Sequence, residues 1–334
     1  MSLGSLATYH PGSVVVFFSA LGFLTFVIVV VKTLSVFVQT FMLKGTQLRK
    51  FGAKSGSWAV VTGASGGIGR EFAIQLGKAG FNVLVASRNY HQLAETVSQI
   101  NANCGTQVQT KIVIVDLSNG RDDGFTRLVD ACQGMDIGIL VNNAGKSHEM
   151  PSDFAETPKH EIDDIVAINI SAVLRVTSIV LPGMIQRKRG LILNIGSFAG
   201  SIPSPMLATY SGSKAFLSTW STALGEEVTR HGITVQHLNT YFVVSDMSKI
   251  RRSSALVPTP ASYVRSCLSK IGLSCGAAFT GRPHTCTPFW SHAFVDWGMG
   301  VIGWKSGIIA YTHRLHRSIR ARALRKKERD AKSQ

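Results

Sequence analysis

"WAVVTGASGGIG", residues 58–69, decides the fold: a short β-forming run leads directly into a glycine-rich turn and then into a helical pattern. Glycines at Gly63, Gly67 and Gly69 let the chain turn tightly and let backbone N–H groups approach a pyrophosphate at the helix N-terminus. A glycine run alone is a weak signal, because structural turns use glycine too. Here a strand precedes it and a helix follows, so the stretch favours a dinucleotide-binding turn.

The alternation of strand and helix continues along the chain. Nearly continuous apolar strands separated by helices predict an α/β fold with a parallel sheet covered on both faces. We expect one doubly wound domain over residues 55–285, without internal repeats, and we assign no last strand. The expected strands are 58–62, 82–87, 110–116, 138–143, 191–197 and 234–239, and the longer segments between them include 66–79, 89–103, 159–187 and 207–230.

The end of the second expected strand indicates which dinucleotide is bound. It reads Ser87-Arg88, where NAD-binding folds place an acidic residue for the ribose 2′-hydroxyl. An arginine at this point accommodates a 2′-phosphate instead, so we expect NADP(H). The alternative is an arginine that simply faces solvent.

A tyrosine and a lysine stand four residues apart in "TYSGSKAF", residues 209–216. On a helix, Tyr210 and Lys214 would share one face. A cation within ~4–6 Å favours the phenolate, so we expect Lys214 to lower the pKa of Tyr210 and to suit the pair to proton transfer with an alcohol oxygen. One such pair also arises readily by chance, so it needs the other motifs beside it.

The N-terminus predicts a membrane anchor. Residues 13–31 are nineteen residues without a charge, and apolar residues continue to position 43. Nineteen helical residues are long enough for a bilayer core of ~30 Å. A cleaved signal peptide would need a basic segment before the apolar run, and residues 1–12 contain no Lys or Arg. The nearby bases all follow the span, which predicts a cytosolic location for the rest of the chain.

The C-terminal region is also distinctive. Residues 289–311 are rich in aromatic and aliphatic side chains but contain Asp296 and Lys305, so an interfacial or re-entrant element is expected rather than a full span. The basic residues after it could lie against anionic lipid or form a solvated tail. The predicted organisation is therefore an anchor and linker (1–54), the catalytic domain (55–285), a membrane-associated segment (286–311) and a basic tail (312–334).

Charge and cysteine content exclude several classes of protein. The net charge is +16, with +5 in residues 1–54 and +7 in residues 312–334, which leaves +4 for the long middle. Basicity at the two ends fits membrane flanks better than a nucleic-acid groove, so no nucleic-acid partner is expected. Five cysteines without metal-ligand spacing predict neither a disulfide framework nor a metal site.

Several motifs occur together: the glycine turn, "NNAG" (142–145), Ser197, and the pair Tyr210 and Lys214. The combination resembles the short-chain dehydrogenase/reductase family, with a Rossmann-type fold, over about residues 55–250. This resemblance implies an enzyme that transfers hydride between a nicotinamide and a carbonyl or alcohol.

The resemblance also implies a role for individual residues. Tyr210 would donate a proton to the substrate oxygen, Ser197 would hydrogen-bond that oxygen, and Lys214 would hold the cofactor ribose. Asn169 would be the fourth catalytic residue, holding a water that connects the lysine to solvent, and Asp116 would contact the adenine. Taken singly, Ser197 could also be a turn residue, Asn169 part of a polar helix face, and Asp116 a helix cap. The residues expected to contact the cofactor are Gly63, Ser65, Gly67, Ile68, Gly69, Ser87, Arg88, Asp116, Asn143, Ala144, Gly145, Tyr210, Lys214, Val243 and Ser245.

A second resemblance concerns the substrate. Residues 239–254, "NTYFVVSDMSKIRRSS", are similar to the membrane-bound 3-oxoacyl-CoA reductases of very-long-chain fatty acid elongation, especially fungal ones. Asp246 departs from that group, in which a small residue is expected. The bases Lys249, Arg251 and Arg252 would pair with CoA phosphates, unless they only form a solvated loop.

The resemblance therefore implies NADPH-dependent reduction of 3-oxoacyl-CoA at the endoplasmic reticulum membrane, with the catalytic domain in the cytosol. Two alternatives stay open: a microsomal 17β-hydroxysteroid or retinol-type dehydrogenase, and a non-catalytic scaffold for other elongation enzymes. The lipid bilayer is an expected partner, while other elongation enzymes and a homo-oligomer are left open.

Overall fold

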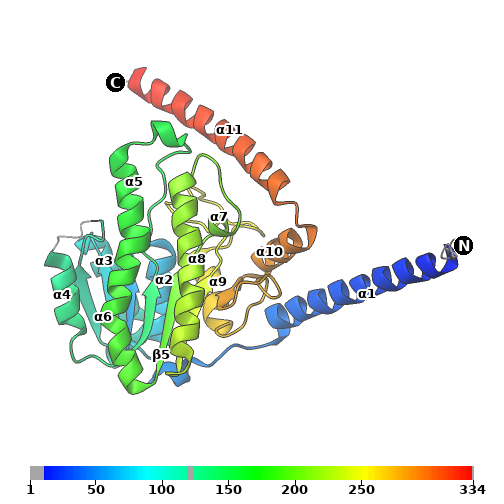
Figure 1. Cartoon of the computed structure of the whole chain (residues 1–334). Helices are drawn as coiled ribbons and strands as arrows, with labels where there is room; N and C mark the ends of the chain where they lie inside the picture. The colour runs from blue at the N-terminus through cyan, green and yellow to red at the C-terminus, as the bar shows by residue number, and fades with distance from the viewer. Residues whose placement is uncertain (1–10, 119–122, 333–334) are drawn as a thin grey trace, which may run out of the picture.

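A seven-stranded parallel sheet forms the centre of the molecule, in the order β3-β2-β1-β4-β5-β6-β7 (Figure 1). The computed structural model describes residues 11–118 and 123–332. The predicted doubly wound α/β fold is confirmed. The strands are β1 (Trp58–Thr62), β2 (Asn82–Ser87), β3 (Thr110–Ile114), β4 (Ile137–Asn142), β5 (Gly190–Ile195), β6 (Ile233–Leu238) and β7 (Thr285–Cys286).

Helices cover both faces of the sheet. Successive residues of each strand point to opposite faces, and both faces are apolar and buried. In β1, Ala59 and Val61 pack into one apolar cluster, while Val60 between them packs into the other. The first cluster is covered by α2, α3 and α9, and the second by α4, α6 and α8. The helices of this part of the chain, with α5 and α7 included, are α2 (Gly67–Lys78), α3 (Tyr90–Cys104), α4 (Asp123–Cys132), α5 (Lys159–Val166), α6 (Ala172–Arg187), α7 (Phe198–Ser201), α8 (Ala208–Thr229) and α9 (Pro260–Ser269).

The sequence-based boundaries agree closely with the structure for six strands. The ranges expected for β1 and β2 are those observed, and the other four differ by one or two residues at either end. The strand left unassigned is β7, which has only two residues and therefore no alternating pattern to detect. Helix α4 was not expected either.

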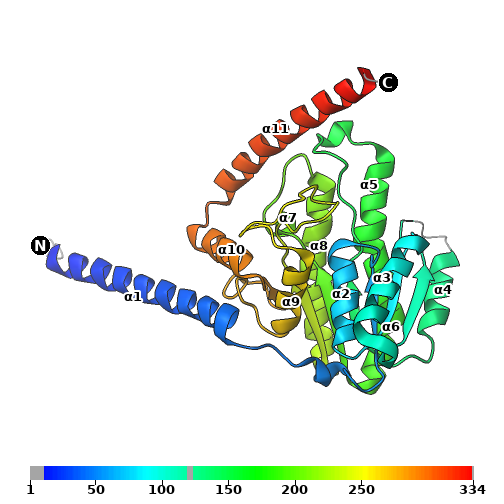
Figure 2. The same cartoon turned by 180° about the vertical axis from the view of Figure 1, so that it is seen from behind.

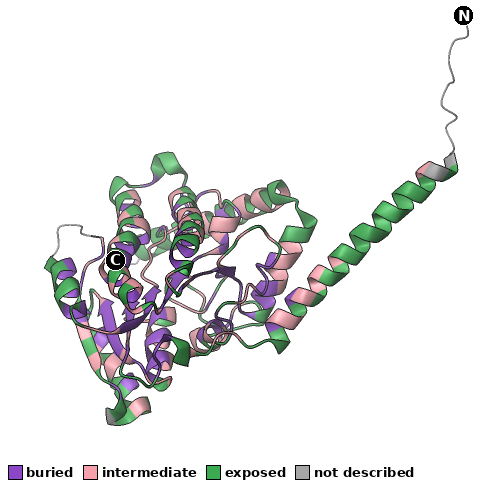
Figure 3. Ribbon diagram, turned by 60° about the horizontal axis from the view of Figure 1, so that its bottom comes forward, coloured by how far each residue is buried: buried purple, intermediate pink, exposed green. Residues whose placement is uncertain are grey.

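The N-terminal helix α1 (Pro11–Phe37) projects away from the domain (Figures 1 and 3). Together with the π-helical turn η1 (Val38–Met42) it contains a 29-residue candidate span, Val14–Met42, whose most apolar window has mean hydropathy 2.9 and no buried residue. The first ten residues of the predicted anchor lie outside the described residues. At the base of α1, the Gln39 side chain accepts hydrogen bonds from the backbone N–H groups of Ser274 and Cys275.

Helix α10 (Trp290–Ile302) lies beside the base of the anchor, with the rings of Phe41 and Phe294 6.1 Å apart. Asp296, the charge that argued against a full span, points into the catalytic domain. It is 4% exposed, pairs with the Arg282 guanidinium at 2.7 Å and accepts a hydrogen bond from Asn239 at 3.0 Å. One face of α10 therefore packs on the α/β domain, and only the other face is available for other contacts.

The basic C-terminal region forms helix α11 (Lys305–Lys332). It crosses from the end of α10 over the carboxyl edge of the sheet towards α5 (Figures 1 and 2). The expected choice between a lipid-bound and a solvated tail therefore misses a third arrangement, in which this segment docks on its own domain. The last two residues of the predicted tail lie outside the described residues.

Candidate active site

Ser197, Tyr210 and Lys214 converge at the carboxyl edge of the sheet. Ser197 follows β5 and caps the short helix α7, while Tyr210 and Lys214 come from the first turns of α8. The Ser197 hydroxyl lies close enough to the Tyr210 phenol to lower its pKa. The Lys214 Nζ lies 5.9 Å from the centre of the Tyr210 ring and donates to the carbonyl of Ile195 at 2.7 Å. The structure therefore brings together three of the four predicted catalytic side chains.

The electrostatics of this pair differ from the expectation. Burial raises the pKa of Tyr210 above its ordinary value, although the neighbouring Ser197 hydroxyl opposes that rise. Burial also lowers the pKa of Lys214 to about 8. The expected lowering of the Tyr210 pKa by Lys214 is therefore not observed here, because loss of hydration on burial is the largest influence on the phenol.

Asn169 lies in a π-helical turn, η5 (Ala167–Ser171), that interrupts the long helix between α5 and α6. Its side chain is 1% exposed and holds Lys146 by both backbone groups: Oδ1 accepts from the Lys146 N–H at 2.8 Å and Nδ2 donates to the Lys146 carbonyl at 2.9 Å. Nδ2 also donates to the Ser213 hydroxyl at 2.9 Å. Both amide hydrogens are thus used within the protein. The extra residue of a π-turn redirects a side chain, and such turns are frequent at functional sites.

Gly145 fits between the predicted catalytic residues. A Cβ at this position would lie 3.5 Å from the Asn169 Oδ1 and 3.6 Å from the Lys214 Nζ. The "NNAG" motif therefore joins the glycine turn on one side and the Asn169–Lys214 region on the other.

The glycine turn is packed tightly against the end of β4. Gly63 has φ +63°, and a Cβ there would come within 2.8 Å of the Ala144 Cα. A Cβ on Gly69 would lie 2.3 Å from the Asn143 side chain, which donates to the carbonyls of Thr62 and Gly63. Only glycine fits at these two positions, so the motif is required by close backbone packing as well as by any bound phosphate.

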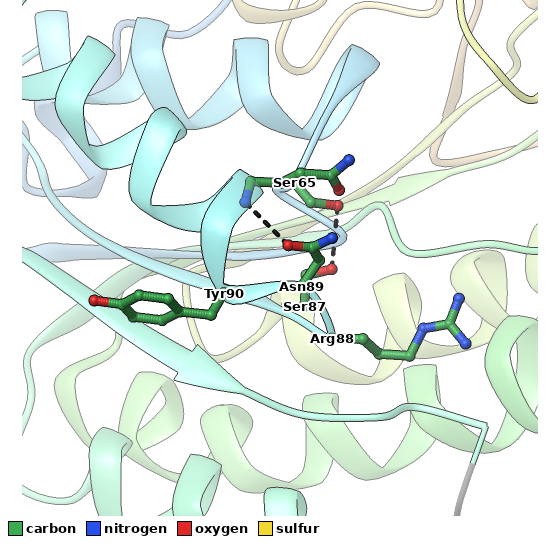
Figure 4. A pocket seen from close by; sticks show the side chains of 6 residues that line it. Ser65, Ser87, Arg88, Asn89 and Tyr90 are labelled. Carbon is green, nitrogen blue, oxygen red and sulfur yellow. Dashed lines mark hydrogen bonds between the residues drawn. The ribbon is translucent and has the colours of Figure 1, made fainter.

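A pocket of about 600 Å³ opens where β1 and β2 end (Figure 4). The Ser87 hydroxyl donates to the Ser65 hydroxyl across it at 3.1 Å. The Arg88 side chain is 66% exposed, with Nη1 3.9 Å from a carboxylate oxygen of Asp116. The pocket is lined by Ser65, Ser87, Arg88, Asn89, Tyr90 and Gln92, and Tyr210 is not among them, so it lies at the predicted adenosine end of the cofactor.

The segment after β6 lies beside the glycine turn. Val243 is buried, and the Ser245 side chain would be 3.7 Å from a Cβ on Gly67. Lys249 is exposed, and its Nζ donates to the Glu149 carbonyl at 2.6 Å. The other two predicted substrate residues, Arg251 and Arg252, are exposed, as is Asp246.

Some structural supports of this site carry no local sequence signal. Arg70 in α2 donates to the Ser65 carbonyl at 2.6 Å and pairs with Glu95 on α3 at 3.1 Å, which holds the glycine turn from behind. Asn142 and Asn194 form a buried hydrogen bond of 2.9 Å between β4 and β5. Each pair joins residues that are far apart in the chain, so spacing along the sequence could not find them.

The family model for short chain dehydrogenases matches residues 57–255. The chain belongs to the short-chain dehydrogenase family. A relative from Laccaria bicolor, named very-long-chain 3-oxoacyl-CoA reductase, is 61% identical over 92% of this chain and 90% of its own length.

Two solved structures show the same fold. A metagenomic short-chain oxidoreductase in complex with NADP is 32% identical, with a TM-score of 0.52, over 56% of this chain and 82% of its own. A 7β-hydroxysteroid dehydrogenase is 20% identical, with a TM-score of 0.67, over 80% of this chain and 99% of its own. The short-chain dehydrogenase match ends at residue 255, so α9, β7, α10 and α11 all lie beyond the part that defines the family.

Proposed function

We propose that this short-chain dehydrogenase reduces very-long-chain 3-oxoacyl-CoA to 3-hydroxyacyl-CoA with NADPH, in fatty acid elongation. The observation that carries the proposal is the 61% identity to the Laccaria bicolor reductase over nine-tenths of both chains. The contacts among Ser197, Tyr210 and Lys214 support it, because a scaffold protein has no need of them. A non-catalytic role is therefore disfavoured.

The described residues fit a bound NADPH. The tight glycine turn at Gly63 leads into the N-terminus of α2, where backbone N–H groups favour a pyrophosphate. At the end of β2, Arg88 supplies an exposed guanidinium beside the pocket, which suits the additional 2′-phosphate. NADP in the metagenomic oxidoreductase supports this choice.

When bound, reduced nicotinamide supplies the hydride that adds to the 3-oxo carbon. The chain's own residues manage the negative charge that develops on the oxygen. The hydroxyls of Ser197 and Tyr210, which lie beside each other, would both meet that oxygen, and Tyr210 would donate its proton to it. The Lys214 ammonium stabilises the phenolate that remains, and Asn169 holds the Gly145–Lys146 backbone that borders this group.

A membrane location completes the proposal. The bare apolar helix α1 would span the endoplasmic reticulum bilayer, and residues 55–285 would face the cytosol, as the basic residues after the span favour. The exposed face of α10 and the exposed Trp304 would lie at the headgroups beside the anchor. A very-long acyl chain is itself membrane-soluble, so the enzyme would meet its substrate at this surface.

A substrate panel tests the proposed function. Membrane-embedded protein is assayed for NADPH oxidation with 3-oxoacyl-CoAs of graded chain length, beside a steroid ketone and with NADH as the cofactor control. We expect the highest kcat/KM with long 3-oxoacyl-CoA and NADPH. A steroid ketone turned over better than every 3-oxoacyl-CoA would replace the proposal with a hydroxysteroid dehydrogenase.

A further inference from the structure

Helix α11 is held on the domain with little apolar packing. Among its 28 residues His316 alone is buried, at 8% exposure. Its apolar side chains at helical spacing, such as Ile308, Ile319 and Ala323, are only half-buried, so they contribute little hydrophobic stabilisation. Its course over the carboxyl edge of the sheet, seen from both sides in Figures 1 and 2, therefore depends on a few polar contacts.

Two side chains on one face of α11 make these contacts. His316 Nδ1 lies 2.6 Å from the Pro205 carbonyl oxygen, and because a carbonyl can only accept, this nitrogen carries the hydrogen. One turn later, Arg320 donates to the Pro151 carbonyl at 2.9 Å and pairs with the Glu156 carboxylate at 2.6 Å. Residues four apart share a helix face, so His316 and Arg320 form a single clasp.

The two loops that the clasp contacts are hydrogen-bonded to each other. The residues after the two prolines, Ser152 and Met206, are joined by a backbone hydrogen bond of 2.8 Å from the Ser152 N–H to the Met206 carbonyl. Met206 has φ +67°, a left-handed conformation that a non-glycine residue adopts only when its surroundings hold it there. Helix α11 is thus attached to both partners of this bridge.

The bridged loops are the two walls of the candidate active site. One loop leaves Gly145, which lies against the Lys214 ammonium and the Asn169 amide. The other follows α7 and leads into α8, so that Met206 stands four residues before Tyr210. The position of the Ser152–Met206 bridge therefore sets the distance between the walls.

We propose that His316 and Arg320 are positioning residues that hold these two loops at the spacing a long acyl-CoA substrate requires. The proposal rests on the function proposed above. A short acyl group needs only the reacting groups around Tyr210, whereas a long one also contacts the walls. Binding energy from such remote contacts is what orients the reacting carbonyl.

The kinetic test compares Arg320→Ala and His316→Ala with Arg317→Ala and Arg322→Ala, which remove exposed bases from the same helix. We expect the ratio of kcat/KM for a long 3-oxoacyl-CoA to that for 3-oxobutanoyl-CoA to fall roughly fivefold or more, the scale of one partly exposed charge-assisted hydrogen bond. The two control variants should keep the wild-type ratio. Arg320→Lys, which keeps the charge but not the two-pronged contact, should lie between wild type and Arg320→Ala. Equal ratios in all variants overturn the proposal.

Amide hydrogen exchange gives a readout that needs no substrate. In both clasp variants, exchange should become faster in residues 151–157 and 202–207 and stay unchanged in β1 and β2. Unchanged exchange in the two loops contradicts the clasp even where turnover is normal. Faster loop exchange in an enzyme that reduces no 3-oxoacyl-CoA overturns the proposed function instead. If Arg320→Ala loosens the whole sheet, the same comparison is decided with Arg320→Lys.

Discussion

Within residues 11–118 and 123–332, two helical stretches are long and apolar enough to cross a membrane, and they differ in their surroundings. Val14–Met42 and Lys159–Arg187 each have 29 residues, with mean hydropathies of 2.9 and 1.9. No residue in the apolar window of the first is buried, whereas 44% of the second window is buried against the sheet. Length and apolarity alone therefore do not distinguish an anchor from a core helix.

The two stretches differ in their polar residues and in what surrounds their apolar side chains. The second stretch contains Asn169, whose amide is fully used inside the protein, and its remaining apolar side chains fill one face of the sheet. The first stretch contains Lys32 as its single charge, and most of its phenylalanines and valines are exposed, with the buried Val36 near its base as the exception. In the proposed membrane location the first stretch anchors the enzyme, and the second helps to build the site.

The sharpest way to break this comparison places the same charge in both stretches. Val176 in α6 is 1% exposed and Val31 in α1 is 57% exposed. An unpaired buried carboxylate costs several kcal/mol, against a total stability of about 5–15 kcal/mol. Val176→Asp should therefore abolish the cooperative thermal unfolding transition of the purified protein.

Val31→Asp is the matched substitution and should leave the unfolding transition of the catalytic domain unchanged. Its effect should be on membrane retention, measured by flotation with liposomes, since a charge in a span disfavours insertion by about 3 kcal/mol. Equal loss of folding in both variants would show that α1 is part of the core.

A second test sharpens the role of the core helix. Asn169→Ala removes three hydrogen bonds and leaves buried backbone groups of Lys146 unpaired. Because each unpaired group costs about 1–3 kcal/mol, the Gly145–Lys146 backbone should shift and kcat should fall about 10- to 100-fold. Ser178→Ala, on the exposed side of α6, should keep kcat within twofold in the same steady-state assay. A similar fall in both would assign the effect to the helix as a whole.

The pH dependence separates the site from the anchor. Burial lowers the pKa of Lys214 to about 8, while the raised pKa of Tyr210 keeps the phenol protonated there. Lys214 is an ammonium below pH 8 and loses its charge above it, so kcat for reduction should fall at alkaline pH, approaching tenfold per pH unit. Protein lacking residues 1–42 should show the same profile, because the core, not the anchor, buries the lysine. A profile that is flat from pH 7 to 10 contradicts this assignment.

The smallest expected effect concerns the exposed loop charges. If Arg251 and Arg252 pair with CoA phosphates, replacing both by Gln should raise KM for 3-oxoacyl-CoA about three- to tenfold, as expected for exposed ion pairs of up to ~1 kcal/mol each. KM for a ketone without CoA should not change. An equal rise for both substrates would assign the two arginines to folding of the loop.

The sequence was sufficient for the features that depend on local pattern. Alternating apolar runs located six of the seven strands, and the four-residue spacing placed Tyr210 and Lys214 on one helix at the candidate site. What it missed depends on residues far apart in the chain. The two-residue strand β7 pairs only with the edge of β6, and the π-turn at Asn169 was not anticipated within the expected segment 159–187.

The C-terminal region shows the same limit. A basic, weakly apolar segment is typical of a tail, and nothing near Arg320 in the sequence indicates that it meets Pro151 and Glu156. Likewise, Asp296 made residues 289–311 a poor membrane span by sequence, but its ion-pair partner Arg282 lies in the loop before β7. In both cases the role of the charged residue depends on a partner that only the folded structure brings close.

The account depends most on Tyr210 as the proton donor beside Ser197 and Lys214. The most direct measurement is the single-turnover rate of NADPH oxidation by Tyr210→Phe with saturating long-chain 3-oxoacyl-CoA, compared with wild type, together with NADPH binding. We predict a rate loss of about 10²- to 10⁴-fold, the usual contribution of a general acid, with NADPH affinity kept within a few-fold. A rate within threefold of wild type would contradict the account.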